Sequence, residues 1–385
     1  MKKLRILLVN KNMIAGGIET SMLSFIENLK NIAEIDVMLF NKSGILIEKL
    51  PKDVNVYEGG FILRSLNRDC QTTICNNSDP ILKKKKNILK IIKALGARKI
   101  LSWFAFFGQK LKKHYDIAIA YNGLDELCSK FVIKRVKADV KIDYIHYDMD
   151  HYQLSKGQIN LFKKFNKLIC VSKSCAEIFE KKHPEFKDKI DYLYNFQDVN
   201  KIIRSAEEFK VDYPKTFNIV SVSRLSKEKA HVRSLKIFKT LKEEGYKFHW
   251  HIVGDGEERL KIENFINENN MGEYVTLCGN QKNPYPYIKS ANMFYLGSLN
   301  EAAPMVYSES MLLRVPVITT KTRSAVELVG EYGFVCENNE DEIYLTLKQL
   351  LENKELVSQK MKQLEDYTYN NESIIKKFMV WRKLC

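Results

Sequence analysis

The stretch that most constrains the fold is residues 292–320, which has the pattern of one strand–helix–strand unit. An apolar run of strand length covers Met293 to Gly297, and a polar loop follows it. A helical segment then opens at Pro304 and ends before a second apolar run, Val317 to Thr320. Two buried strands joined by a helix are the repeating unit of α/β folds, so this stretch predicts an α/β protein.

Two glutamates bracket the start of that helix. Proline fixes the φ angle that a first helical position needs, so Pro304 places Glu301 in the loop and Glu309 inside the helix. A helix start has unpaired N–H groups and the positive end of the helix dipole, so Met305 and Val306 are candidates to hold an anionic or hydroxyl-rich ligand. We expect the two carboxylates to bind the hydroxyl groups of that ligand.

The two acids stand eight residues apart with Pro304 between them, which resembles the E-x7-E signature of retaining glycosyltransferases of family 4. The resemblance implies that Glu309 holds the ribose hydroxyls of a nucleotide and that Glu301 holds the C3 and C4 hydroxyls of the transferred sugar. The alternative for two glutamates at this spacing is an exposed loop acid and a solvated helical acid.

A second candidate loop lies near the N-terminus. The apolar run Leu4 to Val9 is followed by Gly16-Gly17 and a helical pattern from Ser21 to Leu29, the order that opens a Rossmann-like unit. A glycine pair at a helix start lets backbone approach a phosphate, although a plain turn has the same composition. The segment GGIETSM resembles the GG-x-E loop of family 4, which implies that the glycines face the diphosphate and the reacting sugar.

The strand Lys141 to His146 ends in a histidine followed by Asp148-Met149-Asp150. The histidine resembles the one in the family 4 IH-x-D segment, which implies a place in the inter-domain cleft near the donor; a satisfied core histidine is the alternative. Metal-dependent glycosyltransferases of the other major fold hold a divalent cation with such a D-x-D triplet. The rest of the chain does not match that fold, so we predict no metal site.

A basic pair follows the strand pattern FNIVSVSR. Arg224 and Lys229 stand five apart across a strand-to-helix turn, and a guanidinium fork beside an ammonium suits a diphosphate. The pair resembles the family's R-x4-K element. The chain departs from that element at Ser223 and Ala230, which puts the backbone fit there in doubt.

Residues Val275 to Gly279, with Leu277 at their centre, resemble the strand that cradles the nucleobase in family 4 through backbone groups. Side chains therefore do not reveal the base. A UDP-sugar is the expected co-substrate, with no cofactor and no required metal.

Alternating strands and helices occur in two successive sets, and the resemblance implies the GT-B fold of two Rossmann-like domains facing a cleft. We assign residues 1–198 to an acceptor-binding domain and 199–365 to a nucleotide-sugar-binding domain. Residues 366–385 are expected to form a helix that crosses back onto the first domain.

The chain of 385 residues carries a formal net charge of +15, which favours anionic partners, and no nucleic-acid-binding motif accompanies the charge. The eight cysteines are scattered and predict neither a zinc site nor a disulfide framework. No run of about 20 uncharged apolar residues is present, so we expect a cytoplasmic protein. The basic, aromatic segment Lys83 to Lys113 fits either docking on the inner face of the cell membrane or packing in the core.

These patterns together predict a retaining glycosyltransferase that moves a sugar from a nucleoside diphosphate to an acceptor hydroxyl. The acceptor we expect is a glycan or a lipid-linked saccharide in bacterial envelope or capsule synthesis. Two alternatives remain at this stage. One is a non-hydrolysing nucleotide-sugar epimerase of the same fold, and the other is a non-catalytic protein that binds membranes or polyanions.

Overall fold

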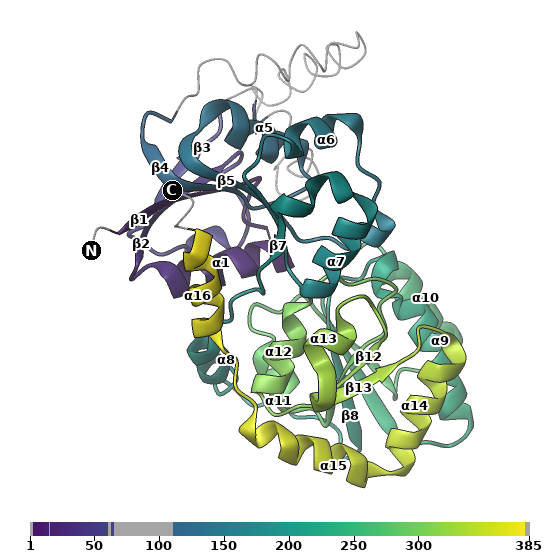
Figure 1. Ribbon diagram of the computed structural model, residues 1–385. Helices are drawn as coiled ribbons and strands as arrows, with labels where there is room; N and C mark the ends of the chain where they lie inside the picture. Colours follow the sequence, from purple (N-terminus) through teal and green to yellow (C-terminus); the bar gives the residue numbers. More distant parts are fainter. Residues whose placement is uncertain (1–2, 15, 61–62, 65–110, 382–385) are drawn as a thin grey trace, which may run out of the picture.

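The computed structural model describes residues 3–14, 16–60, 63–64 and 111–381, which form two α/β halves (Figure 1). Each half is built on a sheet whose described strand pairs are all parallel, as expected for strands that alternate with helices. Most of the basic segment Lys83–Lys113 lies outside the described residues. Among the described residues, no helix combines the length and the apolar character needed to cross a bilayer.

The first sheet has the strand order β3-β2-β1-β4-β5-β6-β7. Its strands are β1 (Leu4–Asn10), β2 (Ala33–Leu39), β3 (Asn55–Glu58), β4 (His114–Ala120), β5 (Lys137–Ile145), β6 (Lys167–Cys170) and β7 (Ile190–Tyr192). The helices of this half include α1 (Gly17–Leu29), α5 (Glu126–Arg135), α6 (Lys156–Phe162) and α7 (Lys173–Lys182).

The second sheet has the order β10-β9-β8-β11-β12-β13. Its strands are β8 (Phe217–Val222), β9 (Phe248–Val253), β10 (Val275–Gly279), β11 (Met293–Leu296), β12 (Val317–Thr320) and β13 (Gly333–Cys336). Two of these strands, β10 and β12, have the bounds that the sequence predicts. The helices are α8 (Val199–Ser205), α9 (His231–Glu243), α10 (Arg259–Glu268), α11 (Tyr285–Lys289), α12 (Met305–Leu312), α13 (Ala325–Val329), α14 (Glu340–Glu352) and α15 (Lys354–Gln363).

Helices cover both faces of the second sheet and create two separate apolar cores. Side chains of α9, α10 and α14 form one core with residues such as Trp250. Side chains of α8, α11, α12 and α13 form the other, with residues such as Phe294. A strand with apolar side chains on both faces reads as a continuous apolar run, which is why the sequence locates these strands so closely.

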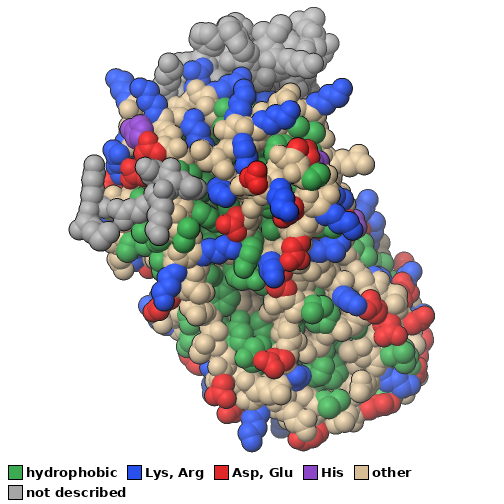
Figure 2. Space-filling model, in the orientation of Figure 1, with side chains coloured by type: hydrophobic (Ala, Val, Ile, Leu, Met, Phe, Trp, Pro, Cys, Tyr) green, Lys and Arg blue, Asp and Glu red, His purple; other side chains and the backbone are tan. Residues whose placement is uncertain are grey.

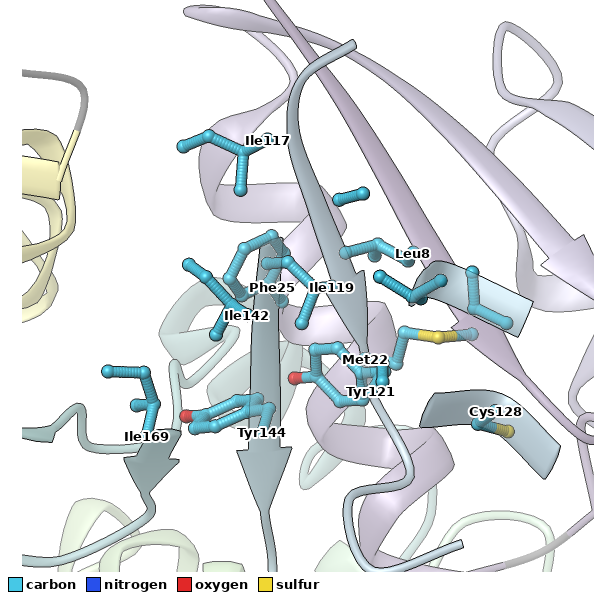
Figure 3. Packing of buried hydrophobic residues seen from close by; sticks show 14 of the residues in the cluster. Leu8, Met22, Phe25, Ile117, Ile119, Tyr121, Cys128, Ile142, Tyr144 and Ile169 are labelled. Carbon is cyan, nitrogen blue, oxygen red and sulfur yellow. The ribbon is translucent and has the colours of Figure 1, made fainter. Parts of the chain in front are cut away.

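The core of the first half continues into the last helix of the chain, α16 (Asn371–Val380), which lies beside α1 (Figure 1). The ring of Phe378 on α16 meets Phe25 on α1 at 5.4 Å and Trp381 at 5.6 Å between ring centres. Phe25 in turn packs edge-on against Tyr121, next to Tyr144 (Figure 3). The final helix therefore crosses back onto the first sheet.

One local prediction was wrong in detail. Pro304 is not the first residue of α12, because its ψ of 122° is extended, and the helix begins at Met305. Proline thus occupies the N-cap position, with no side-chain oxygen to accept a bond from the helix start.

Replacing Phe378 by alanine is expected to lower the free energy of unfolding by about 3–5 kcal/mol, because it empties a buried aromatic site that joins α16 to α1. The matched control is Val380→Ala on the same helix, where the side chain is 57% exposed and the change should stay within about 0.5 kcal/mol. Urea unfolding of both variants measures the difference. Equal midpoints for the two variants would show that α16 is not held by this contact.

Candidate functional site

The predicted site residues lie near the carboxyl ends of strands in both halves, either on the loops that follow or in the elements that these loops join. Gly16 is the N-cap of α1, and a Cβ atom built on it would lie 2.5 Å from Oε2 of Glu19 and 3.8 Å from Nη2 of Arg224. Arg224 comes from the loop after β8, so the structure brings the glycine loop of the first half against the arginine of the second. A Cβ atom on Gly17 would meet no atom within 4 Å.

Lys229 and Glu301, predicted to bind the diphosphate and the sugar, form an ion pair with each other. The Lys229 ammonium donates to Oε1 of Glu301, and the Ser298 hydroxyl donates to the same oxygen at 2.6 Å. Both charged side chains are largely buried, with 19% of Lys229 and 10% of Glu301 exposed. Sequence reasoning missed Ser298, although it directly follows the predicted strand.

The two departures from the family pattern are visible in the backbone and in the contacts here. Ala230 has φ 52° and ψ 36°, the left-handed conformation that glycine adopts without strain. A hydrogen bond of 3.1 Å joins Ser223 Oγ to Nε2 of His231, the first residue of α9. Burial and the nearby Lys229 lower the pKa of His231 to about 4, so this ring is neutral at pH 7.

Glu309 lies about one turn inside α12 and is buried. Burial raises the pKa of its carboxyl to about 7, opposed by a hydrogen bond from Tyr285 and by the charge of Lys201. Tyr285, on α11, is a contact that sequence reasoning missed, because α11 has only five residues and shows no periodic pattern. Glu309 and Glu301 thus have different partners.

His146 follows β5 and contacts rings of the first sheet, with centroid distances of 5.1 Å to Tyr121 and 4.5 Å to Tyr144. Burial lowers the pKa of His146 to about 3, so the imidazole is neutral at pH 7. Its Nε2 is buried and has no hydrogen-bond partner among the described residues. The ring therefore belongs partly to the core, while one polar atom remains available.

The remaining predicted positions are those expected to contribute backbone groups. Leu277 is half-buried in β10, which bulges between Leu277 and Gly279, and the carbonyl of Gly279 accepts from the N–H of Gly254 at 2.8 Å. Met305 is buried and Val306 half-buried in the first turn of α12.

The carboxylates of the D-x-D triplet have protein partners. Asp148 accepts a hydrogen bond from the N–H of Asp150 at 2.9 Å and so begins a short 3-10 turn. Asp150 pairs with Lys182 and with Arg323, which comes from the second half. Within the described ranges, no three His, Cys, Asp or Glu side chains are grouped so as to hold a metal ion.

Another carboxylate joins the halves. Glu327 on α13 accepts hydrogen bonds from the N–H groups of Lys173 and Ser174, the first residues of α7, at 2.8 and 2.9 Å. The Tyr194 hydroxyl also donates to it, at 2.6 Å. A carboxylate at a helix start is favoured by the unpaired N–H groups and by the helix dipole, and these bonds lower the pKa of Glu327. Sequence reasoning did not identify this contact.

Residues 203–371 match the family model described as "Glycosyl transferases group 1". The match covers somewhat less than half of the chain and includes the whole second sheet. Arg224, Lys229, Glu301 and Glu309 all lie inside the matched residues.

Curated glycosyltransferases are also similar to this chain, over part of their length. The chain is 33% identical over 172 residues to an N-acetylgalactosaminyltransferase of Campylobacter jejuni that acts on a diphospho-undecaprenol-linked saccharide, with 44% of this chain and 46% of the relative covered. It is 28% identical over 169 residues to an uncharacterised glycosyltransferase of Methanocaldococcus jannaschii, with 42% of each covered. The chain thus aligns with somewhat less than half the length of these two relatives.

Solved glycosyltransferase structures match the whole chain in fold. A TarM variant of S. aureus, in complex with fondaparinux, alpha-GlcNAc-glycerol and UDP, has a TM-score of 0.72 at 14% identity, with 99% of this chain and 100% of that chain covered. Anabaena HepE in complex with UDP and glucose has a TM-score of 0.67 at 17% identity, with 98% of each chain covered. The predicted GT-B fold is confirmed.

Ala230→Gly is expected to raise the free energy of unfolding of the protein by about 0.5–1 kcal/mol, because glycine adopts the left-handed conformation without strain. Urea unfolding measures the change. The control is Ala325→Gly at the start of α13, where the backbone is helical and the same exchange should cost about 1 kcal/mol. A loss of stability in both variants would contradict a strained Ala230.

Comparison of the wild type with Glu309→Gln should reveal the raised pKa of Glu309. The folded chain binds a proton at pH values where the unfolded carboxyl, with a pKa near 4.5, is ionised. The wild type therefore loses stability relative to the variant as the pH rises from 4.5 to about 7, by roughly 3 kcal/mol in all. Urea unfolding across this pH range measures the two curves, and parallel curves would contradict the shift.

Proposed function

We propose that this chain is a retaining, metal-independent glycosyltransferase that moves a sugar from a UDP-sugar to a hydroxyl of a lipid-linked saccharide. The observation that carries the proposal is the Lys229–Glu301 ion pair at one end of the second sheet, next to the loop where Arg224 meets Gly16. Cations for a diphosphate and a carboxylate for a sugar thus lie side by side between the two halves.

The geometry leaves the paired groups free to act on a substrate. An ammonium has three N–H donors, and Lys229 uses one on Glu301, so the others can bind a phosphate oxygen. The contacts of Glu301 with Lys229 and Ser298 both use Oε1, which leaves Oε2 to accept a sugar hydroxyl. Arg224 supplies a planar fork for the other phosphate.

Charge develops on the departing diphosphate as the sugar becomes cation-like. Arg224, Lys229 and the N–H groups at the start of α12 stabilise that charge, the role that preorganised donors play at an oxyanion. These groups supply the positive charge that a metal ion provides in other transferases. Removal of a single such donor costs about 3–4 kcal/mol in comparable sites.

The proposal also covers the proton of the acceptor hydroxyl and the anomeric configuration of the transferred sugar. His146 is neutral at pH 7, so it binds sugar or phosphate by hydrogen bonding rather than by charge. The proton of the acceptor hydroxyl passes to the departing phosphate oxygen, and the new bond forms on the face that the phosphate leaves, which retains the anomeric configuration. Glu309 holds the ribose hydroxyls from inside α12.

The names of similar proteins support the substrate classes. HepE and TarM were each solved with UDP, which favours a uridine nucleotide for this chain. Besides the C. jejuni transferase, the relatives include an O-antigen biosynthesis glycosyltransferase of E. coli, 27% identical over 237 residues, and a capsular polysaccharide biosynthesis glycosyltransferase of S. aureus, 29% identical over 131 residues. They favour a bacterial surface polysaccharide as the product.

The distribution of charge supports work at the inner face of the cell membrane. Residues 1–198 hold 35 Lys and Arg against 22 Asp and Glu, whereas residues 199–385 hold 27 against 25. Lysine and arginine side chains lie on the visible face of the first half (Figure 2). An anionic surface attracts such an excess with about 1 kcal/mol for each nearby cation. Lys113, at the end of the basic segment, instead pairs with buried Asp36 at 3.0 Å.

A thermal-shift screen with UDP, GDP, ADP and CMP tests the donor site, with Gly17→Ala beside the wild type. UDP at 100 times its dissociation constant should add about 2.7 kcal/mol of stability to the wild type. The variant should fold as well as the wild type, because its methyl group meets no protein atom within 4 Å. It should lose most of the UDP shift, because that methyl group lies where the diphosphate approaches the backbone.

Gly272→Ala is the matched control, since a Cβ atom there also meets nothing within 4 Å and the residue precedes β10, at the opposite end of the sheet. This variant should keep the full UDP shift. Stabilisation by none of the four nucleotides would overturn the transferase proposal. A full UDP shift in Gly17→Ala would instead remove the glycine loop from the site. Conversion of a UDP-sugar without any acceptor would indicate an epimerase.

A further inference from the structure

The loop that carries Glu301 is held by side chains of the other half of the molecule. Residues 297–304 connect β11 to α12, and the backbone carbonyls of Ala302, Ala303 and Met305 accept hydrogen bonds from residues 172–197. Met305 begins α12, whereas the carbonyls of Ala302 and Ala303 precede the helix and have no partner within a helix or a sheet. Their bonds therefore determine where the loop lies.

The first carbonyl is bound at the start of α7. The Ser172 hydroxyl donates to Ala302 O at 3.1 Å, and the Cys175 thiol lies 3.5 Å from the same oxygen. Ser172 also accepts from the N–H of Cys175 as the N-cap of α7. Ser172 and Cys175 are fully buried, so this contact is shielded from water.

The next two carbonyls are bound by the segment that links the sheets. Asn195 Nδ2 donates to Ala303 O at 3.3 Å. Gln197 Nε2 donates to Met305 O at 3.2 Å and to the Ser308 hydroxyl at 2.6 Å. Asn195 and Gln197 are two positions apart in the chain, and both amides point to the same side, toward the start of α12.

Asn195 and Gln197 are themselves fixed by elements of the first half. Ser21 on α1 donates to Asn195 Oδ1 at 2.7 Å, and Tyr369 donates to the carbonyl of Asn195. Asn371 at the start of α16 donates to the carbonyl of Gln197 at 2.7 Å. Asn195 is 7% exposed and Gln197 is 1% exposed. A cavity of about 40 Å³ lies beside them, lined by residues of both halves that include Tyr194 and Ser308.

We propose that Asn195 and Gln197 are positioning residues that place Glu301 and the first turn of α12 for sugar transfer. They touch neither Glu301 nor Glu309, and they act through the backbone of residues 303–305. Glu301 and Glu309 each have a partner within the second half, Lys229 and Tyr285. Loss of the two amides therefore displaces the backbone between the two glutamates, which sets their relative positions.

The experiment has two measurements on Asn195→Ala and Gln197→Met, each of which removes an amide donor. Hydrogen exchange of the protein alone reports whether residues 301–308 are held, and peptides from this stretch should exchange about tenfold faster in both variants. Turnover of the UDP-sugar that the wild type accepts reports positioning. The kcat should fall about tenfold or more, and the dissociation constant of UDP should rise by a smaller factor, because a misplaced reacting group costs rate and only the N–H groups of α12 also contact the diphosphate.

Phe131→Ala on α5 is the control for a general loss of stability. The ring is buried against Phe40 in the first half and takes no part in the hydrogen bonds of Asn195 and Gln197. This variant should be less stable and yet show wild-type exchange over residues 301–308. Equally fast exchange in Phe131→Ala would mean that stability, not the two amides, controls the loop.

The kinetic measurement rests on the proposed function, whereas the exchange measurement does not. Unchanged exchange in both amide variants would overturn the inference even if the protein is a transferase. Faster exchange with unchanged kcat would show that the amides hold the loop but do not position it for reaction, which also overturns the inference. A wild type that turns over no nucleotide sugar would defeat the proposed function, and exchange alone would then decide whether the amides hold the loop.

Discussion

The whole arrangement depends on the parallel pairing of strands in both sheets. Parallel strands place all their carboxyl ends at one edge, and each following helix starts at that same edge. Residues that are remote in sequence are therefore gathered without any special motif, as Gly16 and Arg224 show. Because two such edges approach each other, glycine backbone, helix starts and charged side chains meet between the halves.

The charges between the two halves are partly neutralised by each other. Lys229 is neutralised by Glu301, so the net positive charge comes mainly from Arg224, whose side chain is exposed. A largely buried ion pair with an additional hydroxyl donor compensates its own charges, whereas burial without a paired cation shifts the pKa of a carboxyl toward the neutral form. Glu309 shows the second behaviour, since its pKa rises to about 7 where burial outweighs its partners. Two carboxylates eight residues apart thus lie in different electrostatic surroundings.

The sequence predicts the sheets and the principal charged residues, because buried parallel strands are continuous apolar runs and loops follow their ends. It does not predict helices of five residues such as Tyr285–Lys289, which are too short to show a period of 3.6. It also cannot show which amide binds which carbonyl, since Asn195 and Ala303 are 108 positions apart and asparagine is common in turns. Ser223 and Ala230 depart from the family element, which put the backbone fit there in doubt. In the structure, Ala230 has the left-handed conformation.

The contacts between the halves are mostly polar, and this affects how the site can work. The apolar core of the first half includes Ala302, with Ala303 packed against it, but no other apolar side chain from residues 199–365 among those described. Hydrogen bonds such as those of Glu327 and Gln197 can be replaced by bonds to water at a net cost of only about 1 kcal/mol each. Separation of an apolar core costs far more. An interface of this kind permits relative motion of two domains. Because the bonds that hold residues 302–305 cross this interface, the position of the loop that carries Glu301 depends on how the two halves meet.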